Sequence, residues 1–373
     1  MKIASASVYL IQWPFTRPVQ HSLARHDSTS NLIVKLTDEA GLCGFGEGVP
    51  RDYVTGETVE AALEALRDSL LPGLLGRSFE LDEVLGFLSR VFKEDVLDAC
   101  PAAACAAELA LLDLAGRVFG LSMGQMLGPA GGNELTYSAV IPLTAIGQLQ
   151  EILGLIQALG LSQVKIKVGR DDDLERVAFI RKALGPEVSL RVDANGAWSV
   201  PEAVERIGGL AELGVEAVEQ PVSGDDIEGL AEVTRRVHPL VLADESVCTP
   251  AQARTLIKER AVGGFNLRLS KCGGPARTLQ LLDLARQAGL SCQLGCQVGE
   301  LGLLSAAGRH LALAQPGFIY LEGALTSFVL DKDIIAEDIT FGYGGKLEAL
   351  TEPGLGVVVM ESRLAESIKY TIS

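Results

Sequence analysis

The segment V-K-I-K-V places two lysines, Lys165 and Lys167, in an otherwise apolar run that is typical of a buried strand. Side chains at positions i and i+2 of a strand point to the same face, so both amines lie on one side. An edge strand whose lysines face water would explain this pair by itself. Three carboxylates, Asp193, Glu219 and Asp244, argue against that interpretation, because each also ends or directly follows a short apolar run.

These charged residues recur at an almost constant interval along the chain. The steps from Lys167 to Asp193, Glu219, Asp244 and Lys271 are 26, 26, 25 and 27 residues long. Each residue lies at or near the C-terminal end of an expected strand. In parallel β/α barrels this is the end at which active sites are built, because the strand ends converge on a common mouth. The interval therefore predicts a site assembled from successive strands.

The strands expected from the sequence are eight in number. They cover residues 135–141, 163–168, 188–193, 215–219, 240–244, 265–270, 291–295 and 318–322. Helical segments lie between them, at 175–184, 201–213 and 278–288 for example, each followed by a glycine that suits a helix C-terminus. Eight strand-then-helix units indicate an α/β fold of the TIM-barrel type.

The first 125 residues have a different pattern. Expected strands at 2–12 and 31–38 are joined by a polar loop and followed by helices from about 57 to 119, which makes an α+β domain. The glycines of G-L-C-G-F-G-E-G match no dinucleotide or phosphate-loop fingerprint, and we interpret them as turn residues. The expected domains are an α+β capping domain (1–125), a barrel (126–325) and a C-terminal segment (326–373), whose strand-like residues 356–360 return to complete the first domain.

Composition excludes several classes of partner. The 373 residues carry 32 basic and 48 acidic side chains, a net charge of -16, so nucleic acid is not an expected ligand. No run approaches the roughly 18 apolar residues of a membrane span, and no signal-peptide pattern is present, so we expect no membrane partner and a cytoplasmic location. The seven cysteines form no zinc set with histidine and are expected to be reduced thiols.

Three carboxylates from neighbouring strands would lie close together at the barrel mouth. Such a cluster of Asp193, Glu219 and Asp244 needs a cation, and an all-oxygen set favours Mg²⁺, with Mn²⁺ as an alternative, over zinc. Asn195 and Gln220, each just beyond a carboxylate, are expected to orient the metal-bound groups. No organic cofactor is expected.

The lysines flank this cluster from opposite sides, Lys165 and Lys167 from the second strand and Lys271 from the sixth. A lysine near a divalent cation and other lysines has its ammonium form disfavoured, which lowers its pKa and lets the amine act as a base. With a metal holding a substrate carboxylate, a base on either side could remove the proton alpha to it. The metal would then stabilise the resulting enediolate.

Five motifs in order, K-I-K, D-A-N, E-Q-P, D-E-S and S-K-C-G-G, resemble those of the muconate-lactonizing subgroup of the enolase superfamily, within the mandelate racemase/muconate lactonizing enzyme family. The resemblance covers essentially the whole chain. It implies a modified barrel, (β/α)7β-like, beneath an N-terminal capping domain. It also implies that Mg²⁺ is bound by Asp193, Glu219 and Asp244. The acid/base groups that it implies are Lys167 and Lys271, with Lys165 lowering the pKa of Lys167 and contacting the substrate carboxylate.

Other residues are expected to support the site or to bind substrate. Glu245, within D-E-S, is expected to form hydrogen bonds in the site. Glu300 and Glu322 follow the seventh and eighth strands and would face the mouth. Arg268 on the sixth strand could reach the site or form a structural ion pair. Capping-domain loops supply the remaining candidates, which are Arg25, His26, Arg51 and Tyr53.

The function that follows is metal-dependent enolisation of a small-molecule carboxylate by a cycloisomerase, racemase or epimerase, which the resemblance implies is a homo-oligomer. A β-elimination like that of o-succinylbenzoate synthase is the alternative within the superfamily, and a Schiff-base lysine aldolase is the alternative outside it. Dipeptide epimerases of the subgroup carry an Asp-x-Asp pair after the eighth strand, where this chain has L-E-G-A-L. This departure argues against a dipeptide substrate.

Overall fold

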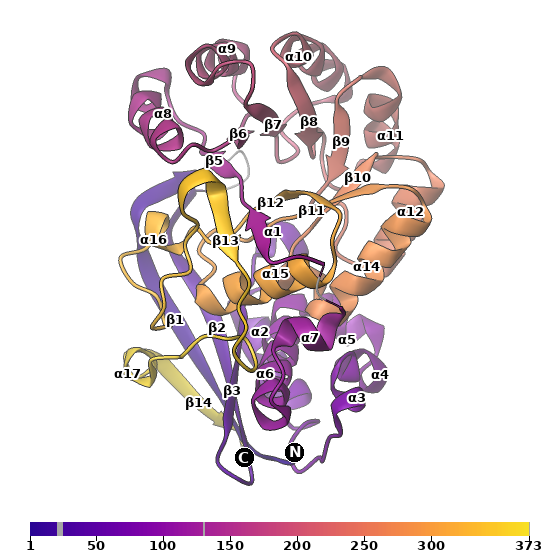
Figure 1. Ribbon diagram of the computed structural model, residues 1–373. Helices are drawn as coiled ribbons and strands as arrows, with labels where there is room; N and C mark the ends of the chain where they lie inside the picture. Colours follow the sequence, from indigo (N-terminus) through magenta and orange to yellow (C-terminus); the bar gives the residue numbers. More distant parts are fainter. Residues whose placement is uncertain (21–24, 130, 373) are drawn as a thin grey trace.

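The computed structural model describes residues 1–20, 25–129 and 131–372. An α+β domain forms one end of the molecule, and a curled sheet surrounded by helices forms the other (Figure 1). The two chain ends lie near each other at the outer end of the α+β domain (Figure 1). Among the described residues, no helix combines the length and the apolar character that a membrane crossing requires.

The capping domain is built on an antiparallel sheet in which the described strands have the order β14-β1-β2-β3. Their bounds are β1 (Ile3–Gln20), β2 (Arg25–Asp38), β3 (Cys43–Gly48) and β14 (Ile368–Ile372). Residues 25–30, which were expected in a polar loop, belong to β2 instead. The prediction that residues 356–360 return as a strand was wrong: β14 pairs with β1 instead, and Val359 forms an isolated bridge with Ile335.

Helices cover one side of this sheet, as expected for residues 57–119. They are α1 (Asp52–Thr55), α2 (Val59–Ala65), the π-helical turn η1 (Leu66–Leu70), α3 (Leu81–Val84), α4 (Phe87–Val91), α5 (Glu94–Ala99), α6 (Pro101–Phe119) and α7 (Met123–Leu127). The central helix is α6, which is almost entirely buried and packs against β2 and β3.

The glycines of β3 explain how closely α6 approaches the sheet. Gly44, Gly46 and Gly48 alternate along the strand and share one face. A Cβ atom on Gly46 would lie 2.1 Å from the carbonyl oxygen of Ala106 in α6, so a side chain has no room there. The prediction that these glycines form turns was wrong for all three. They are strand residues that let a sheet and a helix backbone touch.

The second part of the described chain is a curled sheet of eight parallel strands in sequential order. The strands are β5 (Ala139–Ile141), β6 (Gln163–Lys167), β7 (Ser189–Asp193), β8 (Val215–Glu219), β9 (Leu240–Ala243), β10 (Gly264–Leu267), β11 (Ser291–Leu294) and β12 (Phe318–Leu321). The backbone N–H of Ser138 donates to the carbonyl of Leu321 at 2.9 Å, which links the two outermost strands. The eight-stranded parallel fold is thus confirmed.

Helices connect these strands in the pattern of a (β/α)7β barrel. In chain order they are η2 (Ile146–Gln148), α8 (Leu149–Ala158), α9 (Asp173–Leu184), α10 (Val200–Glu212), α11 (Ile227–Arg236), α12 (Pro250–Lys258), α13 (Leu269–Cys272), α14 (Pro275–Gln287) and α15 (Gly302–Ala314). The segment after β12 contains α16 (Thr326–Val329), η3 (Tyr343–Gly345), β13 (Lys346–Glu348) and α17 (Glu361–Leu364). It runs from the barrel back to the capping sheet (Figure 1).

Two barrel strands differ from their expected bounds by more than one residue. The first is split, because β4 (Glu134–Thr136) pairs with β13 and only β5 joins the barrel. The sixth ends at Leu267, since Arg268 is the N-cap of the short helix α13 and Gly273, with φ 87°, ends that helix. Lys271 therefore lies in a helical turn beyond the strand, whereas Arg268 still has extended backbone angles.

Candidate active site

The three carboxylates predicted to bind a metal meet at the C-terminal ends of neighbouring strands. Asp193 ends β7, Glu219 ends β8 and Asp244 directly follows β9. Parallel register places Lys167 beside Asp193, and Asp193 beside Glu219. The three side chains are completely buried, and one oxygen from each lies within 4.8 Å of the other two. The strand-end interval in the sequence thus corresponds to one compact cluster.

Side chains from the next two strands hold Glu219 in place. The amide of Asn266, in β10, donates to Glu219 at 2.7 Å, and the amide of Gln293, in β11, donates at 2.9 Å. Sequence reasoning missed both residues. A signal was available, because Asn266 lies two positions before Arg268 and so shares the inward face of the strand.

Gln220, Asn195 and Glu245 lie around the cluster as expected. The side-chain oxygen of Gln220 accepts from the backbone N–H of Asp244 at 2.9 Å. The amide of Asn195 donates to Glu245 at 2.9 Å, and the backbone N–H of Asn195 donates to Asp193 at 3.0 Å. Burial raises the pKa of Glu245 to about 7, with further contributions from Asp244 and Asp193. These three residues orient the carboxylates of the triad and are not themselves part of the candidate ligand set.

Lys165 and Lys167 both point into the barrel, so the edge-strand explanation of this pair is wrong. The amine of Lys167 lies 2.6 Å from an oxygen of Asp193 and donates to the side chain of Asn195 at 2.9 Å. The amine of Lys165 lies deeper, 3.3 Å from both Asp193 and Glu219. The two lysines thus neutralise the side of the triad nearest β6.

Two more cations approach the triad from β10 and α13. Arg268 forms an ion pair with Asp244, and its guanidinium lies 3.5 Å from Glu219. A second nitrogen of Arg268 donates to Gln297 at 3.0 Å. The amine of Lys271 donates to the backbone carbonyl of Asp244 at 2.5 Å and to its carboxylate at 2.7 Å. Arg268 therefore does reach the site, and Lys271 contacts only the last carboxylate of the triad.

The lysine pKa values differ in direction from the expectation. Burial alone would lower the pKa of Lys165, but Glu219, Glu322 and Asp193 outweigh burial and raise it well above its ordinary value. For Lys271, burial is likewise outweighed, chiefly by Asp244, and the pKa is raised. The lowering expected from the sequence is therefore not a property of the side chains alone, and it requires a cation on the carboxylates.

Glu322 lies inside the barrel and is paired with cations. Its carboxylate lies 2.8 Å from the amine of Lys165 and 2.7 Å from the guanidinium of Arg191. Although burial opposes ionisation, Lys165 and Arg191 keep the pKa of Glu322 below its usual value. Arg191 was not predicted, but its place two residues before Asp193 put it on the same strand face. The Glu322 carboxylate is thus already paired with two cationic side chains of the protein.

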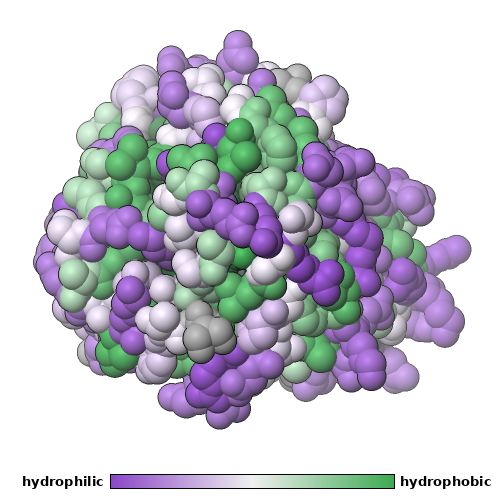
Figure 2. Space-filling model, turned by 90° about the horizontal axis from the view of Figure 1, so that it is seen from below, coloured by the Kyte–Doolittle hydropathy of each residue, from purple (hydrophilic) through white to green (hydrophobic). Residues whose placement is uncertain are grey.

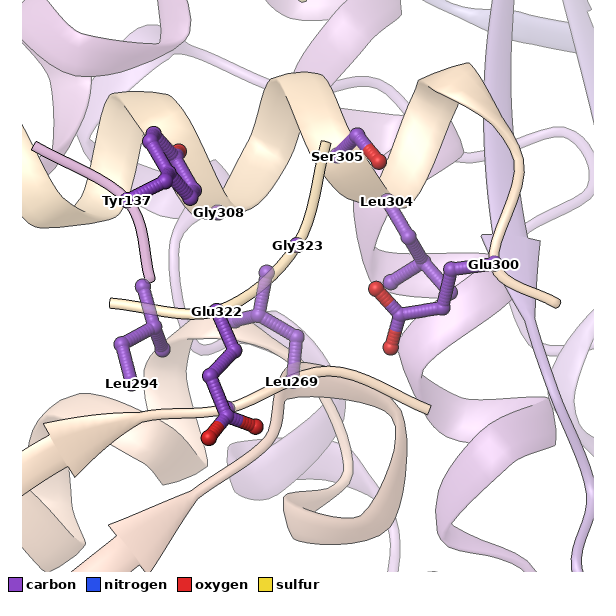
Figure 3. Close-up of a pocket in the computed structure, with 10 residues that line it drawn as sticks. Tyr137, Leu269, Leu294, Glu300, Leu304, Ser305, Gly308, Glu322 and Gly323 are labelled. Atoms are coloured by element: carbon purple, nitrogen blue, oxygen red, sulfur yellow. The ribbon is translucent and has the colours of Figure 1, made fainter. Parts of the chain in front are cut away.

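Glu300 lies in the loop before α15, close to Glu322 in the fold. The two glutamates line a small cavity together with Tyr137, Leu269 and Ser305, and they reach it from different segments (Figure 3). Burial raises the pKa of Glu300 to about 8, although the backbone N–H of Gln297, 2.5 Å away, acts in the opposite direction. Arg268 and Arg51 also interact with Glu300, which places this residue at the edge of the mouth.

The capping domain contributes two of its predicted residues to the mouth. Arg51 is buried and donates to the carbonyl of Val298 at 2.6 Å, so it holds a loop of the barrel. Burial raises the pKa of Tyr53, and Arg51 and Arg268 lie near enough to oppose that rise. The other two candidates, Arg25 and His26, belong to β2 by their backbone, and their side chains lie outside the described residues.

The donor set fits a hard divalent cation. The triad offers carboxylate oxygens from three strands at a common point, and within the described residues no histidine or cysteine joins the group. Mg²⁺ prefers such ligands and zinc does not. The triad would hold the ion, and Asn266, Gln293 and Gln220 would keep its ligands in position.

Comparison with known proteins agrees with this geometry. Residues 4–128 match the family described as Mandelate racemase / muconate lactonizing enzyme, N-terminal domain, and residues 149–363 match Enolase C-terminal domain-like. The chain belongs to the mandelate racemase/muconate lactonizing enzyme family. The fold and the family that were expected from the five motifs are thus confirmed.

Curated members of this family resemble the chain over nearly its full length. The N-succinyl-L-Arg/Lys racemase of Bacillus cereus is 28% identical, with 98% of each chain covered. The L-Ala-D/L-Glu epimerase of Bacillus subtilis is 32% identical over 96% of this chain and 97% of the relative. Muconate cycloisomerase 1 of Rhodococcus opacus is 29% identical over 96% of each.

Solved structures of family members superimpose on the whole chain. The crystal structure of the Bacillus cereus racemase has a TM-score of 0.90 at 27% identity, with 100% of both chains covered. A dipeptide epimerase from Cytophaga hutchinsonii, complexed with Mg and the dipeptide D-Ala-L-Val, has a TM-score of 0.91 at 27% identity and the same coverage. These relatives are racemases, epimerases and cycloisomerases, so the chain is placed among the metal-dependent isomerases of the family, and the β-elimination alternative is not favoured.

Proposed function

We propose that this protein is a Mg²⁺-dependent isomerase that moves the proton alpha to the carboxylate of a small molecule, through an enediolate. The observation that carries the proposal is the buried triad with lysines at the same strand ends. Asp193, Glu219 and Asp244 bind the ion. The ion supplies positive charge that holds the substrate carboxylate and stabilises the enediolate.

The two lysines of β6, Lys165 and Lys167, have different roles beside the triad. Lys167 is the proton-transfer group, because its amine lies at the solvent-facing end of the pair, with 11% of the side chain exposed against 2% for Lys165. Asn195 accepts a hydrogen bond from Lys167 and holds its amine at the edge of the triad. Lys165 remains between Glu219, Asp193 and Glu322 and balances their charge.

The proposed substrate class depends on whether the site has a free carboxylate that could pair with an ammonium group of the substrate. Dipeptide epimerases in the comparisons act on substrates with a free amino group. Here Glu322 is occupied by Lys165 and Arg191, so it offers no free carboxylate to an ammonium group. We therefore propose N-acylated amino acids or lactones of dicarboxylic acids, with Arg51 and Tyr53 above the mouth as the first candidates for specificity. The Glu300 carboxyl, which burial keeps neutral near pH 7, is a further candidate contact.

Proton NMR in D₂O tests the reaction. The protein is incubated with Mg²⁺ and pools of N-acylated amino acids, dipeptides or muconolactones, and loss of the α-hydrogen signal is recorded. We expect exchange in one pool that EDTA stops and that Lys167→Ala abolishes. Lys182→Ala, which removes an exposed lysine of α9, is the matched control. Exchange that survives either EDTA or the loss of Lys167 would show that the proposal is wrong.

Two further proposals concern the protein as a whole. A cytoplasmic location is supported by the seven cysteines, all of which are described and are free thiols.

Homo-oligomeric assembly is supported by apolar patches between polar ones on the face at the capping-domain end (Figure 2). Leu42, Val358 and Ile368 are among the exposed apolar side chains of the molecule. Size-exclusion chromatography with light scattering measures the assembly directly, and a monomer at micromolar concentration would contradict it.

A further inference from the structure

The short helix that carries Lys271 lies against the capping domain. It is α13, which packs on helix α6 of that domain. A Cβ atom on Gly274, two residues beyond α13, would lie 3.3 Å from the Cα atom of Cys105 in α6, so the two backbones lie close together there. Glu108 of α6 accepts a hydrogen bond from the backbone N–H of Ala276 at 3.0 Å. The segment that presents Lys271 is therefore in direct contact with the capping domain.

One hydroxyl group joins α13 to the end of strand β3. The residue after β3 is Val49, whose backbone N–H donates to the Oγ atom of Ser270 at 2.8 Å. The hydroxyl of Ser270 donates in turn to the carbonyl oxygen of Val49 at 3.2 Å. Both residues are buried, and a buried backbone group that loses its hydrogen-bond partner destabilises the fold. Ser270 thus supplies a partner to both polar backbone groups of Val49, as a neighbouring strand would.

Val49 has a fixed position, because the chain is held on both sides of it. On one side, a Cβ atom on Gly48 would lie 2.0 Å from the carbonyl oxygen of Ala102, so β3 touches α6 without space for a side chain. On the other side, Arg51 donates to the carbonyl of Val298 at 2.6 Å. The contact with Val49 therefore ties α13 to a part of the capping domain that has little freedom to move.

Ser270 and Lys271 are neighbours in a single helical turn, so the position of one determines the position of the other. Successive side chains of a helix point about 100° apart, which directs Lys271 away from the capping-domain strand that Ser270 contacts. Lys271 follows the end of β10, whereas Lys167 lies within β6, between β5 and β7 of the barrel sheet. The two lysines are thus held by different parts of the molecule.

We infer that Ser270 is a positioning residue, whose hydrogen bonds to Val49 hold Lys271 where its amine acts on one face of the substrate. The inference rests on the proposed function and on Lys271 as the second acid/base group, as the family resemblance implies. It adds that the capping domain sets the position of one of the two proton-transfer groups. Racemisation or epimerisation depends on this contact, because it uses both faces of the α-carbon.

Inversion of the α-carbon is balanced with these two lysines and water. Lys167 takes the α-proton, and the electron pair of the broken C–H bond enters the enediolate. The ammonium group of Lys271 delivers a proton to the opposite face as the new C–H bond forms, and exchange with water then restores both amines. If Lys167 returns a proton derived from solvent instead, the substrate exchanges hydrogen without inversion. Misplacement of Lys271 therefore lowers inversion while exchange continues.

Amide hydrogen exchange measured by mass spectrometry tests the contact without a substrate. In Ser270→Ala we expect the peptides that contain Val49 and residues 269–274 to exchange about 10-fold faster, which is the effect of about one buried hydrogen bond. Ser122→Ala is the matched control, because it removes another buried hydroxyl of the capping domain, which accepts a backbone N–H at the start of α7. Unchanged exchange in both regions, or a change no larger than in Ser122→Ala, would overturn the inference.

The ratio of inversion to exchange tests the consequence for the reaction. The probes are D and L forms of N-succinyl and N-acetyl amino acids in D₂O with Mg²⁺, and the form whose exchange depends on Lys167 is followed by NMR and chiral chromatography. We expect Ser270→Ala to lower the ratio about 10- to 100-fold, because small misplacements of a reacting group have effects of this size. Ser122→Ala should leave the ratio unchanged. Ser270→Cys keeps a weaker donor and acceptor, should lower the ratio less, and serves as the test if the alanine variant does not fold.

The outcomes of this experiment separate the inference from the proposed function. Equal loss of inversion and exchange in Ser270→Ala would indicate a merely structural role for the hydroxyl and would overturn the inference. So would a wild-type protein that exchanges hydrogen without any inversion. No exchange of any acid by the wild type would count against the proposed function, while amide exchange would still decide whether Ser270 joins α13 to Val49.

Discussion

Each carboxylate of the triad is held by side chains that the barrel brings from other strands. Glu219 is the clearest case, because Lys165, Arg268, Asn266 and Gln293 all contact it. Burial would raise its pKa, yet Lys165 and Arg268 keep the pKa of Glu219 well below its usual value. The carboxylate is therefore ionised and oriented before any ligand arrives, which is what a metal site requires.

Removal of the Asn266 amide tests this support. Asn266→Ala takes away a donor 2.7 Å from Glu219 while leaving every proposed ligand in place. We expect Mg²⁺ affinity, measured by isothermal titration calorimetry, to fall about 10-fold or more, because groups that orient metal ligands typically contribute this much. Asn133→Ala, at an exposed position, is the control. Equal affinity in the two variants would mean that Asn266 does not support the metal site.

At the scale of elements, β3 and α6 of the capping domain pack with their backbones in close contact. Three glycines on one face of β3 let the backbones approach until no side chain fits between them. Helix α6 has small residues on its side of the contact, which are Ala102, Ala106 and Ala110. The strand carrying these glycines also leads directly to Arg51 and the short helix α1, which carries Tyr53, so this packing positions both residues.

A methyl group at the centre of this contact should be poorly tolerated. In Gly46→Ala the new Cβ would lie 2.1 Å from the carbonyl of Ala106 and 2.3 Å from the amide nitrogen of Ala110. Overpacking of this kind costs about 1–3 kcal/mol, which urea denaturation would measure as a loss of unfolding free energy. Gly132→Ala adds the same methyl group in open space and should change little. Comparable stability of both variants would refute the close packing.

At the scale of the whole molecule, two buried glutamates of the capping domain lie at the N-termini of barrel helices. Glu47 accepts from the backbone N–H groups of Leu301 and Leu304 at the start of α15, at 2.7 and 3.0 Å. Glu108 accepts from Ala276 at the start of α14, at 3.0 Å. Helix N-termini favour negative charge, but burial is the larger effect, and it raises the pKa of each glutamate to about 7. The interface between the domains therefore contains carboxyls that titrate near neutral pH.

The pH dependence of the free energy of unfolding should include a contribution from protonation of the Glu108 carboxyl. Its pKa is about 7 when folded and near 4.5 when unfolded, so between these values the folded protein keeps a proton that the unfolded chain releases. Raising the pH from about 4.5 to 7 therefore lowers stability, by at most about 3 kcal/mol for this group, with no further change above 7. Glu108→Gln should shrink the difference in melting temperature between pH 5.5 and pH 8, and an unchanged difference would contradict the assignment. Glu39→Gln, at an exposed position of the same domain, is the control.

The amino-acid sequence by itself determined the barrel and the composition of the triad. Charged residues every 25 to 27 positions were sufficient, because one strand and one helix fill that interval and parallel strands all end at the same side. Tertiary structure alone decided that Arg268 also contacts the triad. Arg268 still has extended backbone angles at the end of β10, whereas Lys271, three residues later, reaches Asp244 from the helical turn α13. Glu322 likewise faces Lys165 and Arg191 instead of a substrate, because contacts across the barrel, more than 100 residues apart in sequence, compete for its charge.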